Sequence, residues 1–559
     1  MNETQRQQVR ENAKYLRQVR PVDPEEIYEY IDEQPHPAAV RQVLREQAPE
    51  LGLLERDDGR FEPVGDEPVS VPFHGVDELP EEVSRAVEDA LVERFGPGWP
   101  DRDSGEALRS SIRDFKRRYL TGATVTYDDV TALGYAIYHV PAYFATVQYV
   151  IGELVADGLV PKQLRVLDVG AGVGGPALGL DALLPDDALV EYHAIEPSDA
   201  VDLLSTMLET TGRNFHTRVH HLPVEEFDPS EALDSRGDTG HEFDLILFGN
   251  VLSELSDPGQ AVVDSLSWLA SDGTVVAIAP ADRNTATQLR EVERTVEREG
   301  DATVYAPTVR LWPNEQPESE SWSFRKHPDI AIPSFQRRLD EGERTMAELA
   351  TPGDDERRSD ATDVEQAART SADAEAGKEQ SSVGDSTGQT SGGDGTVQSS
   401  GGGGAKQSSG GDDTGQSSGG DDTRRPPGTG EFVNVDVQYA YSLLRRDGRT
   451  AIEGRPNRSR VAKMKETERH VTERVDYMAI KLSHDLTAAG NPLYLVGDGS
   501  QKIDHFAVLT RESALNRDLA TAEYGDLLLF ENVLVLWNDD ERAYNLVVDH
   551  ETYVERIPA

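Results

Sequence analysis

A glycine-rich stretch lies between two acidic residues that together could bind a nucleoside. The stretch consists of Gly170, Ala171, Gly172, Gly174 and Gly175, interrupted by Val173. Glycines let the backbone turn tightly and let a ligand lie against bare peptide groups. Asp168 precedes the stretch, and Glu196 follows further along the chain. A carboxylate has two acceptor oxygens, which suit the two hydroxyls of a ribose. The pattern predicts a site for a nucleoside-containing ligand.

Four short apolar runs predict the strands that position this site. They are rich in β-branched residues, are separated by segments of helical length, and cover 166–169, 190–195, 245–248 and 274–279. This alternation predicts a parallel α/β sheet. Asp168 then lies at the end of the first strand, Glu196 ends the second, and Asn250 follows the third. All three side chains are expected at the same edge of the sheet.

The type of nucleoside ligand follows from the acidic residues. A glycine loop alone also occurs in dinucleotide-binding proteins. An acidic residue within the first strand, Asp168, and a second carboxylate for the ribose, Glu196, favour S-adenosylmethionine. Asn250 stands where class I methyltransferases place residues that face the transferable methyl group. We predict an α/β, Rossmann-like class I methyltransferase fold in which Asp168, Asn250, Glu196 and the 170–175 loop bind this cofactor. The alternative is a fold that has kept its shape and lost its ligand.

The residues after the third strand leave the catalytic group unknown. Base N-methyltransferases usually carry Asn/Asp-Pro-Pro-aromatic here, whereas this chain has Asn250-Val251-Leu252-Ser253. That chemistry is disfavoured. Carbon-5 methylation of cytosine requires a cysteine nucleophile, and the chain has no Cys. Glu254 could act as a base, but a Glu that opens a helix more often interacts with the helix dipole.

The composition points to a soluble protein of a salt-rich cytoplasm. The net charge is −48, and only ten of the 55 basic residues are Lys. Such a surface stays hydrated where salt screens ordinary charge effects. An acidic disordered protein would fit only one segment. The absence of Cys excludes disulfides, thiolate zinc sites and thiolate iron–sulfur sites. The polar N-terminus and the absence of a long apolar run predict no secretory signal and no membrane span.

Composition and periodicity suggest five segments. Residues 1–75 read as helices followed by a hairpin, which fits a winged-helix-like module or a plain helical extension. Residues 76–350 contain a helical lead-in and the methyltransferase fold. Residues 351–430 are Gly/Ser/Asp-rich and predict a long disordered insertion. Residues 431–446 should return as a strand of the methyltransferase sheet, because no convincing closing strand precedes the insertion. Residues 447–559 are strand-rich and fit a small β-barrel of the oligonucleotide-binding (OB) type, with a β-sandwich or an added sheet as alternatives.

Four motifs resemble the methyltransferase-like assembly proteins of the mitochondrial small ribosomal subunit and their archaeal and bacterial relatives. The resemblance covers about residues 113–446. It depends on the Tyr-rich run 135–143, on 167–175, on Trp322-Ser323-Phe324, and on 441–446. It implies a class I methyltransferase fold, association with small-subunit ribosomal RNA, and a role in ribosome maturation or translation.

The resemblance would also imply an iron–sulfur cluster, but this chain is not expected to bind one. The mitochondrial members bind the cluster through cysteines. In the matching stretch, Thr308 and Ser323 lie near the expected thiolate positions. Hydroxyl groups do not ligate such a cluster, so no cluster is predicted.

One stretch is a candidate RNA contact in spite of the acidic chain. Residues 454–465 carry five positive charges and no negative charge, from Arg455, Arg458, Arg460, Lys463 and Lys465. RNA binding requires such a local patch. Residues 113–118 form a weaker basic cluster. The alternative is a basic loop that pairs with the protein's own acidic surface.

Three functions remain open. The leading hypothesis is an S-adenosylmethionine-binding protein that acts on the small ribosomal subunit or its rRNA, as a methyltransferase or as an assembly factor. The second is a small-molecule methyltransferase, which the Asn250–Leu255 sequence suits. The third is a non-catalytic RNA-binding scaffold without cofactor.

Overall fold

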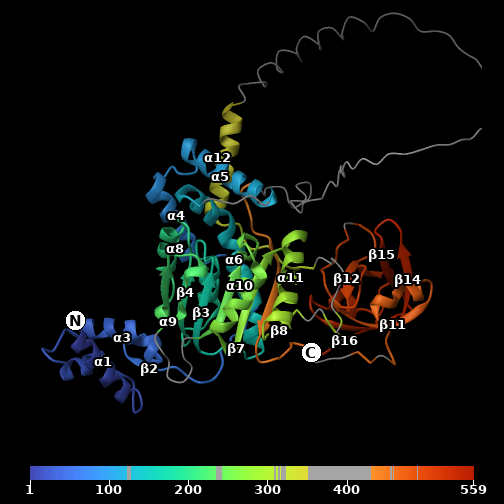
Figure 1. Ribbon diagram of the computed structural model, residues 1–559. Helices are drawn as coiled ribbons and strands as arrows, with labels where there is room; N and C mark the ends of the chain where they lie inside the picture. Colours follow the sequence, from blue (N-terminus) through green and yellow to red (C-terminus); the bar gives the residue numbers. More distant parts are fainter. Residues whose placement is uncertain are drawn as a thin grey trace, which may run out of the picture. The chain divides into compact units, whose positions relative to one another are not determined.

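A mixed β-sheet is formed by strands that lie between residues 163 and 445 (Figure 1). The computed structural model describes residues 1–121, 127–233, 242–307, 310–312, 315, 323–350, 430–452, 456–457, 459–487 and 489–558. The sheet order is β5-β4-β3-β6-β7-β10-β8, and β9 also pairs with β10. Its strands are β3 Gln163–Val169, β4 Leu189–Ile195, β5 Phe215–His220, β6 Phe243–Gly249, β7 Leu269–Pro280, β8 Thr303–Ala306, β9 Arg325–His327 and β10 Val437–Arg445.

The first five strands have the Rossmann-like order that the sequence predicts. β5, β4, β3, β6 and β7 are all parallel. In chain order this is 3-2-1-4-5, with the order reversing at β3. Ligands of such sheets bind beyond the carboxyl ends of the strands, where the order reverses. The ends of β3, β4 and β6 therefore locate the candidate site.

Helices cover both faces of this sheet. Alternate residues of β3 pack to opposite sides, with Leu164 and Val166 in one core and Leu167 and Val169 in the other. The helices and turns of this region are α4 Glu81–Phe95, α5 Arg102–Thr121, α6 Asp129–Ala156, α7 Gly175–Leu183, α8 Val201–Leu208, η2 Val224–Glu226, α9 Pro229–Ala232, η4 Leu252–Glu254, α10 Pro258–Ser265, η5 Leu266–Trp268, α11 Arg283–Glu299 and α12 Ser334–Ala350.

The closing strand of the sheet comes from the far side of the Gly/Ser/Asp-rich segment. β10 runs antiparallel to β7 over the register from Tyr439–Pro280 to Arg445–Thr274. Its residues alternate between the two cores, because Tyr441 and Leu443 join one and Ala440 and Leu444 the other. Residues 351–429, where the disordered insertion was predicted, lie outside the described residues.

The prediction that no closing strand precedes the insertion was wrong. β8 pairs antiparallel with β10, and so does β9. Both are very short, with four and three residues. A strand of this length has no readable alternation, and both strands pair only with β10, which lies far away in the sequence. The pairing therefore could not be read locally.

The N-terminal region consists of three helices and a hairpin, in the expected order. The elements are α1 Glu3–Leu16, α2 Pro24–Ile27, η1 Tyr28–Tyr30, α3 Pro37–Leu51, β1 Leu53–Glu55 and β2 Phe61–Pro63. β1 and β2 are antiparallel, and Val22 makes an additional bridge to Phe61. The elements share a core of their own, in which Val9, Leu44 and Phe61 are completely buried.

The C-terminal region contains the expected small β-barrel. Its elements are η6 Met464–His470, β11 Arg474–Lys481, β12 Leu493–Gly497, β13 His505–Leu509, α14 Asp518–Thr521, β14 Leu527–Asn538, β15 Ala543–Val548 and β16 Tyr553–Ile557. The order β11-β12-β13-β15-β14 closes through a further pairing of β14 with β11, while β16 adds to β14. The pairing of β13 with β15 is parallel.

No helix in the described part of the chain is long and apolar enough to cross a membrane.

Candidate functional site

The glycine loop connects β3 to α7 and has the backbone shape of a ligand cradle. Gly170, Gly172 and Gly174 have φ of +71°, +57° and +87°, a region that side chains disfavour. A Cβ on Gly170 would lie 2.5 Å from Cγ2 of Val251. The segment after β6 therefore passes directly against the loop. Glycine is required here both for backbone conformation and for space.

The Glu196 carboxylate orients this loop. Its Oε2 accepts a hydrogen bond from the backbone N–H of Gly172 at 2.8 Å. Its Oε1 accepts from the N–H of Ser198 at 2.9 Å and from the Ser198 hydroxyl at 2.5 Å. The side chain is 6% exposed. Since a carboxylate offers about four lone-pair positions, this group retains acceptor capacity at the ends of β3 and β4.

Asp168 lies under the loop and is completely buried. The Tyr192 hydroxyl donates to its Oδ2 at 2.6 Å. Its Oδ1 has no hydrogen-bond partner among the described residues. Burial, followed by the charge of Glu196, raises the pKa of Asp168 to about 7, although the Tyr192 hydrogen bond opposes this shift. A buried carboxyl oxygen without a partner is costly and marks this position as an unfilled acceptor.

Helix α6 supplies an aromatic wall beside the loop. A Cβ on Gly175 would meet Cβ of Tyr143 at 3.1 Å, and one on Gly172 would lie 4.0 Å from a ring carbon of Tyr135. The hydroxyls of Tyr135 and Tyr143 are 3.3 Å apart. His139 stacks on Tyr143 with ring centroids 5.0 Å apart. These residues were not among the predicted site residues. Their spacing of four residues, which places them on one helix face, was the available signal.

Glu254 and Tyr127 complete the surroundings of the loop. The Tyr127 hydroxyl donates to Oε1 of Glu254 at 3.4 Å, and the Tyr127 ring packs edge-on against Tyr135 with centroids 5.4 Å apart. Desolvation, and then the charge of Glu196, raises the pKa of Glu254. Glu254 therefore belongs to the group of side chains around the loop. Tyr127 has no local sequence signal that would have identified it.

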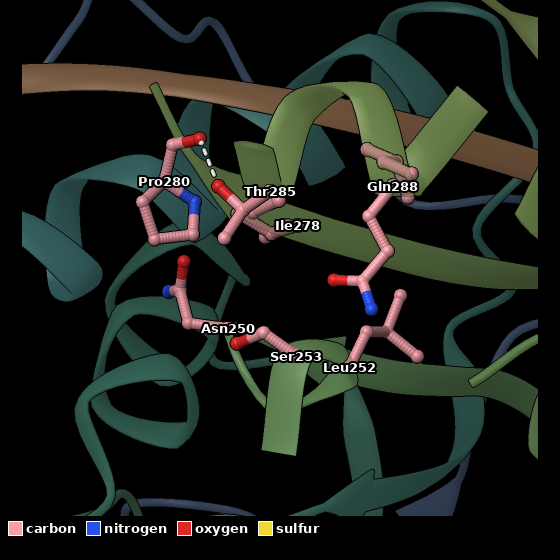
Figure 2. A pocket seen from close by; sticks show the side chains of 9 residues that line it. Asn250, Leu252, Ser253, Ile278, Pro280, Thr285 and Gln288 are labelled. Carbon is pink, nitrogen blue, oxygen red and sulfur yellow. Dashed lines mark hydrogen bonds between the residues drawn. The ribbon is translucent and has the colours of Figure 1, made fainter. Parts of the chain in front are cut away.

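Asn250 lies in a small pocket next to the loop (Figure 2). Its φ of +63° and the hydrogen bond from its N–H to the Ile278 carbonyl at 2.9 Å hold the turn after β6. Figure 2 shows its side chain near Pro280, whose carbonyl accepts from the Thr285 hydroxyl at 3.1 Å. The pocket is small, with room for about one water molecule and not for a whole ligand. It is lined by Asn250, Leu252, Ser253, Ile278, Ala279, Pro280, Thr285, Gln288 and Leu289.

The structure therefore brings most of the predicted residues together. Asp168, Glu196 and the loop from Gly170 to Gly175 form one site. Asn250 lies one residue before Val251, which contacts Gly170, but its side chain lines the neighbouring pocket.

The predicted RNA-contact residues have a different environment. Lys463 and Lys465 both form ion pairs with Glu315, at 2.7 Å for Lys463. Hydrogen bonds from Lys463 and then Lys465 lower the pKa of Glu315 to about 2. Arg460 is exposed. Arg455 and Arg458 lie outside the described residues. The second basic cluster also pairs internally: Arg113 with Glu431, and Arg117 and Arg118 with Asp114.

The stretch that matches the family's cysteine region makes hydrogen bonds to the C-terminal region. The Trp312 indole donates to Oδ2 of Asp498 at 2.6 Å, and the Met464 N–H donates to the same oxygen at 2.9 Å. The hydroxyls of Ser323 and Tyr524 are 3.2 Å apart. Thr308 and Trp322 lie outside the described residues. Within the described ranges, no three His, Cys, Asp or Glu side chains are grouped to hold a metal ion.

Comparisons with known proteins match the two ends of the chain to family models. The description "Domain of unknown function (DUF8157) N-terminal domain" matches residues 6–57. The corresponding C-terminal domain model matches residues 465–557. The sequence has no match among curated proteins.

Similar solved structures cover part of the chain at low identity. The plantazolicin methyltransferase BpumL, solved with a triazolic desmethylPZN analog and SAH, is 12% identical, with 40% of this chain and 79% of that chain covered and a TM-score of 0.24. An arsenic (III) S-adenosylmethionine methyltransferase from Chlamydomonas reinhardtii is 17% identical, with coverage of 26% and 56% and a TM-score of 0.20. A SAM dependent methyltransferase from Aquifex aeolicus is 18% identical, with coverage of 30% and 84% and a TM-score of 0.23. Because these TM-scores are low, the fold assignment depends on the strand order described above.

Proposed function

We propose that this protein binds S-adenosylmethionine and is a methyltransferase. The observation that carries the proposal is the Glu196 carboxylate at the end of β4, which is held against the backbone of the glycine loop at the end of β3. This is the edge at which Rossmann-like sheets bind nucleosides. The buried Oδ1 of Asp168, without a partner among the described residues, also fits a bound ligand.

Each residue has a distinct role in this proposal. Glu196 would accept hydrogen bonds from the ribose hydroxyls, and the 170–175 loop would lie against the ligand with its peptide groups. Asp168 would accept a hydrogen bond through its free Oδ1. When bound, the cofactor supplies a methyl group on a positively charged sulfur, which a nucleophile can attack.

Calorimetric titration with S-adenosylmethionine and with S-adenosylhomocysteine (SAH) tests the proposal. The wild-type chain should bind both in concentrated potassium chloride. Glu196→Ala should lower both affinities by roughly 2 kcal/mol, because hydrogen bonds to a charged acceptor are lost. The matched control is Glu209→Ala, an exposed glutamate at the end of α8. Because Glu196 also holds Gly172, melting curves must first establish that the variant folds. Unchanged affinity in a folded Glu196→Ala protein would remove this residue from the site.

A second part of the proposal concerns the partner, which we take to be RNA of the small ribosomal subunit. The supporting observation is the strand order of the C-terminal barrel. It closes as β11-β12-β13-β15-β14, pairs β13 with β15 in parallel, and places α14 between β13 and β14. OB-fold barrels, many of which bind oligonucleotides, have this connectivity. A small-molecule acceptor would leave the barrel without a role.

Capture of bound RNA tests this second part. The tagged full-length chain should be cross-linked in cells, purified at high potassium chloride and its RNA sequenced. Enrichment of small-subunit rRNA over an equally acidic tagged control protein is expected. RNA that matches the control, together with intact S-adenosylmethionine binding, would favour a small-molecule methyltransferase.

A further inference from the structure

Three tyrosines and a glutamate beside the glycine loop form a group that cofactor binding alone does not explain. We call Tyr127, Tyr135, Tyr143 and Glu254 the tyrosine–glutamate cluster. Tyr135 and Tyr143 come from α6, Tyr127 immediately precedes that helix, and Glu254 ends η4. The three tyrosines are half-buried and Glu254 is exposed, so parts of all four side chains remain accessible to a ligand. The inference drawn below rests on the proposed function.

Direct contacts link the four side chains to one another. Tyr127 donates to Glu254 at 3.4 Å, its ring contacts Tyr135 at 5.4 Å between centroids, and the Tyr135 and Tyr143 hydroxyls are 3.3 Å apart. The rings of Tyr135 and Tyr143 are 6.1 Å apart and edge-on. The hydroxyls and the carboxylate therefore gather in one place, with ring edges and faces around them.

The cluster lies beside the glycine loop. Tyr143 packs against Gly175, Tyr135 lies beside Gly172, and Val251, three residues before Glu254, contacts Gly170. The glycine loop is thus flanked on one side by α6 and on another by the segment after β6. Both flanking segments contribute to the cluster.

The local charge is negative. Burial, followed by the charges of Glu254 and Glu196, raises the pKa of Tyr127. Burial and the charge of Glu254 likewise raise the pKa of Tyr143. Lys116 lies over the Tyr138 ring, with its ammonium 4.7 Å from the ring centroid. The Glu254 and Glu196 carboxylates disfavour phosphate and attract N–H groups and cations, and the tyrosine rings add cation–π attraction.

We propose that the tyrosine–glutamate cluster binds the methyl acceptor and that the acceptor atom is a nitrogen bearing a hydrogen. Glu254 accepts the N–H hydrogen bond, Tyr127 holds the Glu254 carboxylate in place, and Tyr135 and Tyr143 pack against the group that carries the nitrogen. In the reaction, the nitrogen lone pair forms the new bond to the methyl carbon. The carbon–sulfur bond breaks, its electron pair stays on sulfur, which becomes neutral, and the nitrogen loses its proton to Glu254.

A pair of cofactor analogues tests this placement without knowledge of the substrate. Sinefungin carries a protonated amine where the cofactor carries its methylated sulfur, whereas SAH is neutral there. Titration calorimetry with both ligands should be performed on the wild-type chain, Glu254→Gln and Tyr127→Phe. The control is Glu93→Gln, an exposed glutamate on α4. Melting curves establish that each variant folds.

The expected result is selective for the amine. Glu254→Gln should weaken sinefungin roughly tenfold, as for the loss of a charge-assisted hydrogen bond, and leave SAH within about twofold. Tyr127→Phe should weaken sinefungin by a smaller factor, and Glu93→Gln should change neither ligand.

Two outcomes would overturn the inference in distinguishable ways. If SAH does not bind the wild-type chain, the proposed cofactor site is wrong and the inference falls with it. If SAH binds but Glu254→Gln weakens both ligands equally, or neither, the cofactor site stands and Glu254 does not face the transfer position.

Discussion

The glycine-loop site and the basic stretch at 454–465 are each organised by one glutamate, with opposite consequences. Glu196 accepts hydrogen bonds from Gly172 and Ser198 and orients the loop at the end of two parallel strands. Glu315 instead pairs with Lys463 and Lys465 and neutralises part of the stretch that the sequence marked as basic. One carboxylate arranges its neighbours around a site, and the other removes charge from a surface.

The comparison shows which sequence patterns correctly predict a property of the folded protein. The positions of Asp168 and Glu196 follow from strand ends, and the carboxyl ends of parallel strands meet at one sheet edge whatever surrounds them. The charge of a surface patch depends on every residue that packs nearby, including those distant in sequence. Glu315 lies almost 150 residues before Lys463, so the local charge count could not include it.

The largest effect should come from removing β10. This truncation tests whether the glycine-loop region folds without the residues that follow the predicted insertion. A chain ending at residue 350 loses Val437, Tyr439, Tyr441, Leu443 and Leu444, all buried. At about 1.5–3 kcal/mol each, their burial is comparable with the whole stability of a typical domain. We expect this chain to lose cooperative unfolding and S-adenosylmethionine binding. Circular dichroism melting and calorimetry provide the measurements.

The matched control for this truncation deletes residues 355–425 and keeps both sides of the insertion. Its melting temperature should stay close to that of the full chain, because the cost of loop closure changes only slowly with loop length. If the chain ending at 350 melts as cooperatively and as high as the full chain, β10 is not needed for the glycine-loop region.

A smaller effect is the pH dependence of stability, which tests the buried position of Asp168 at the glycine loop. Its pKa is raised to about 7 from the ordinary value of 3.8, so between about pH 4 and 7 the native state binds more protons than the unfolded state. The contribution of Asp168 to stability therefore falls as pH rises through this window, by on the order of 4 kcal/mol in total. Asp168→Asn should flatten this slope in urea melts between pH 4 and 7. The exposed Asp202→Asn should retain the wild-type slope, and an equal slope in all three proteins would contradict the assignment.

The smallest expected effect concerns Glu315. Glu315→Gln frees Lys463 and Lys465 from their ion pairs. Binding to single-stranded RNA should then tighten and depend more steeply on salt, by about 0.7 in the log–log slope for each lysine that reaches a phosphate. Fluorescence anisotropy with a labelled oligonucleotide measures this slope, with Glu541→Gln as the control on the barrel. An unchanged slope would mean that these lysines do not face RNA.

Several features of the fold and the site were predictable from the sequence. The apolar runs at 166–169 and 190–195 lie within β3 and β4, because burial on both faces of a parallel sheet selects continuous β-branched sequence. The glycine loop was predictable because glycine adopts the positive φ of Gly170 and Gly172 with less strain than other residues. The alternation in 432–444 indicated a strand within 431–446, which is β10 at Val437–Arg445.

Other features were decided by tertiary structure. β8 and β9 are too short for a pattern and exist as strands only because β10 pairs with them. Tyr127 reaches Glu254 across a separation of 127 residues, and Trp312 reaches Asp498 across 186. The sequence alone determined where β3, β4, β6, β7, β10 and the glycine loop lie, because those depend on local backbone preferences and on which residues avoid water. Which side chains meet around the loop, and which charges cancel, depends on contacts between distant segments, and only the folded chain sets these.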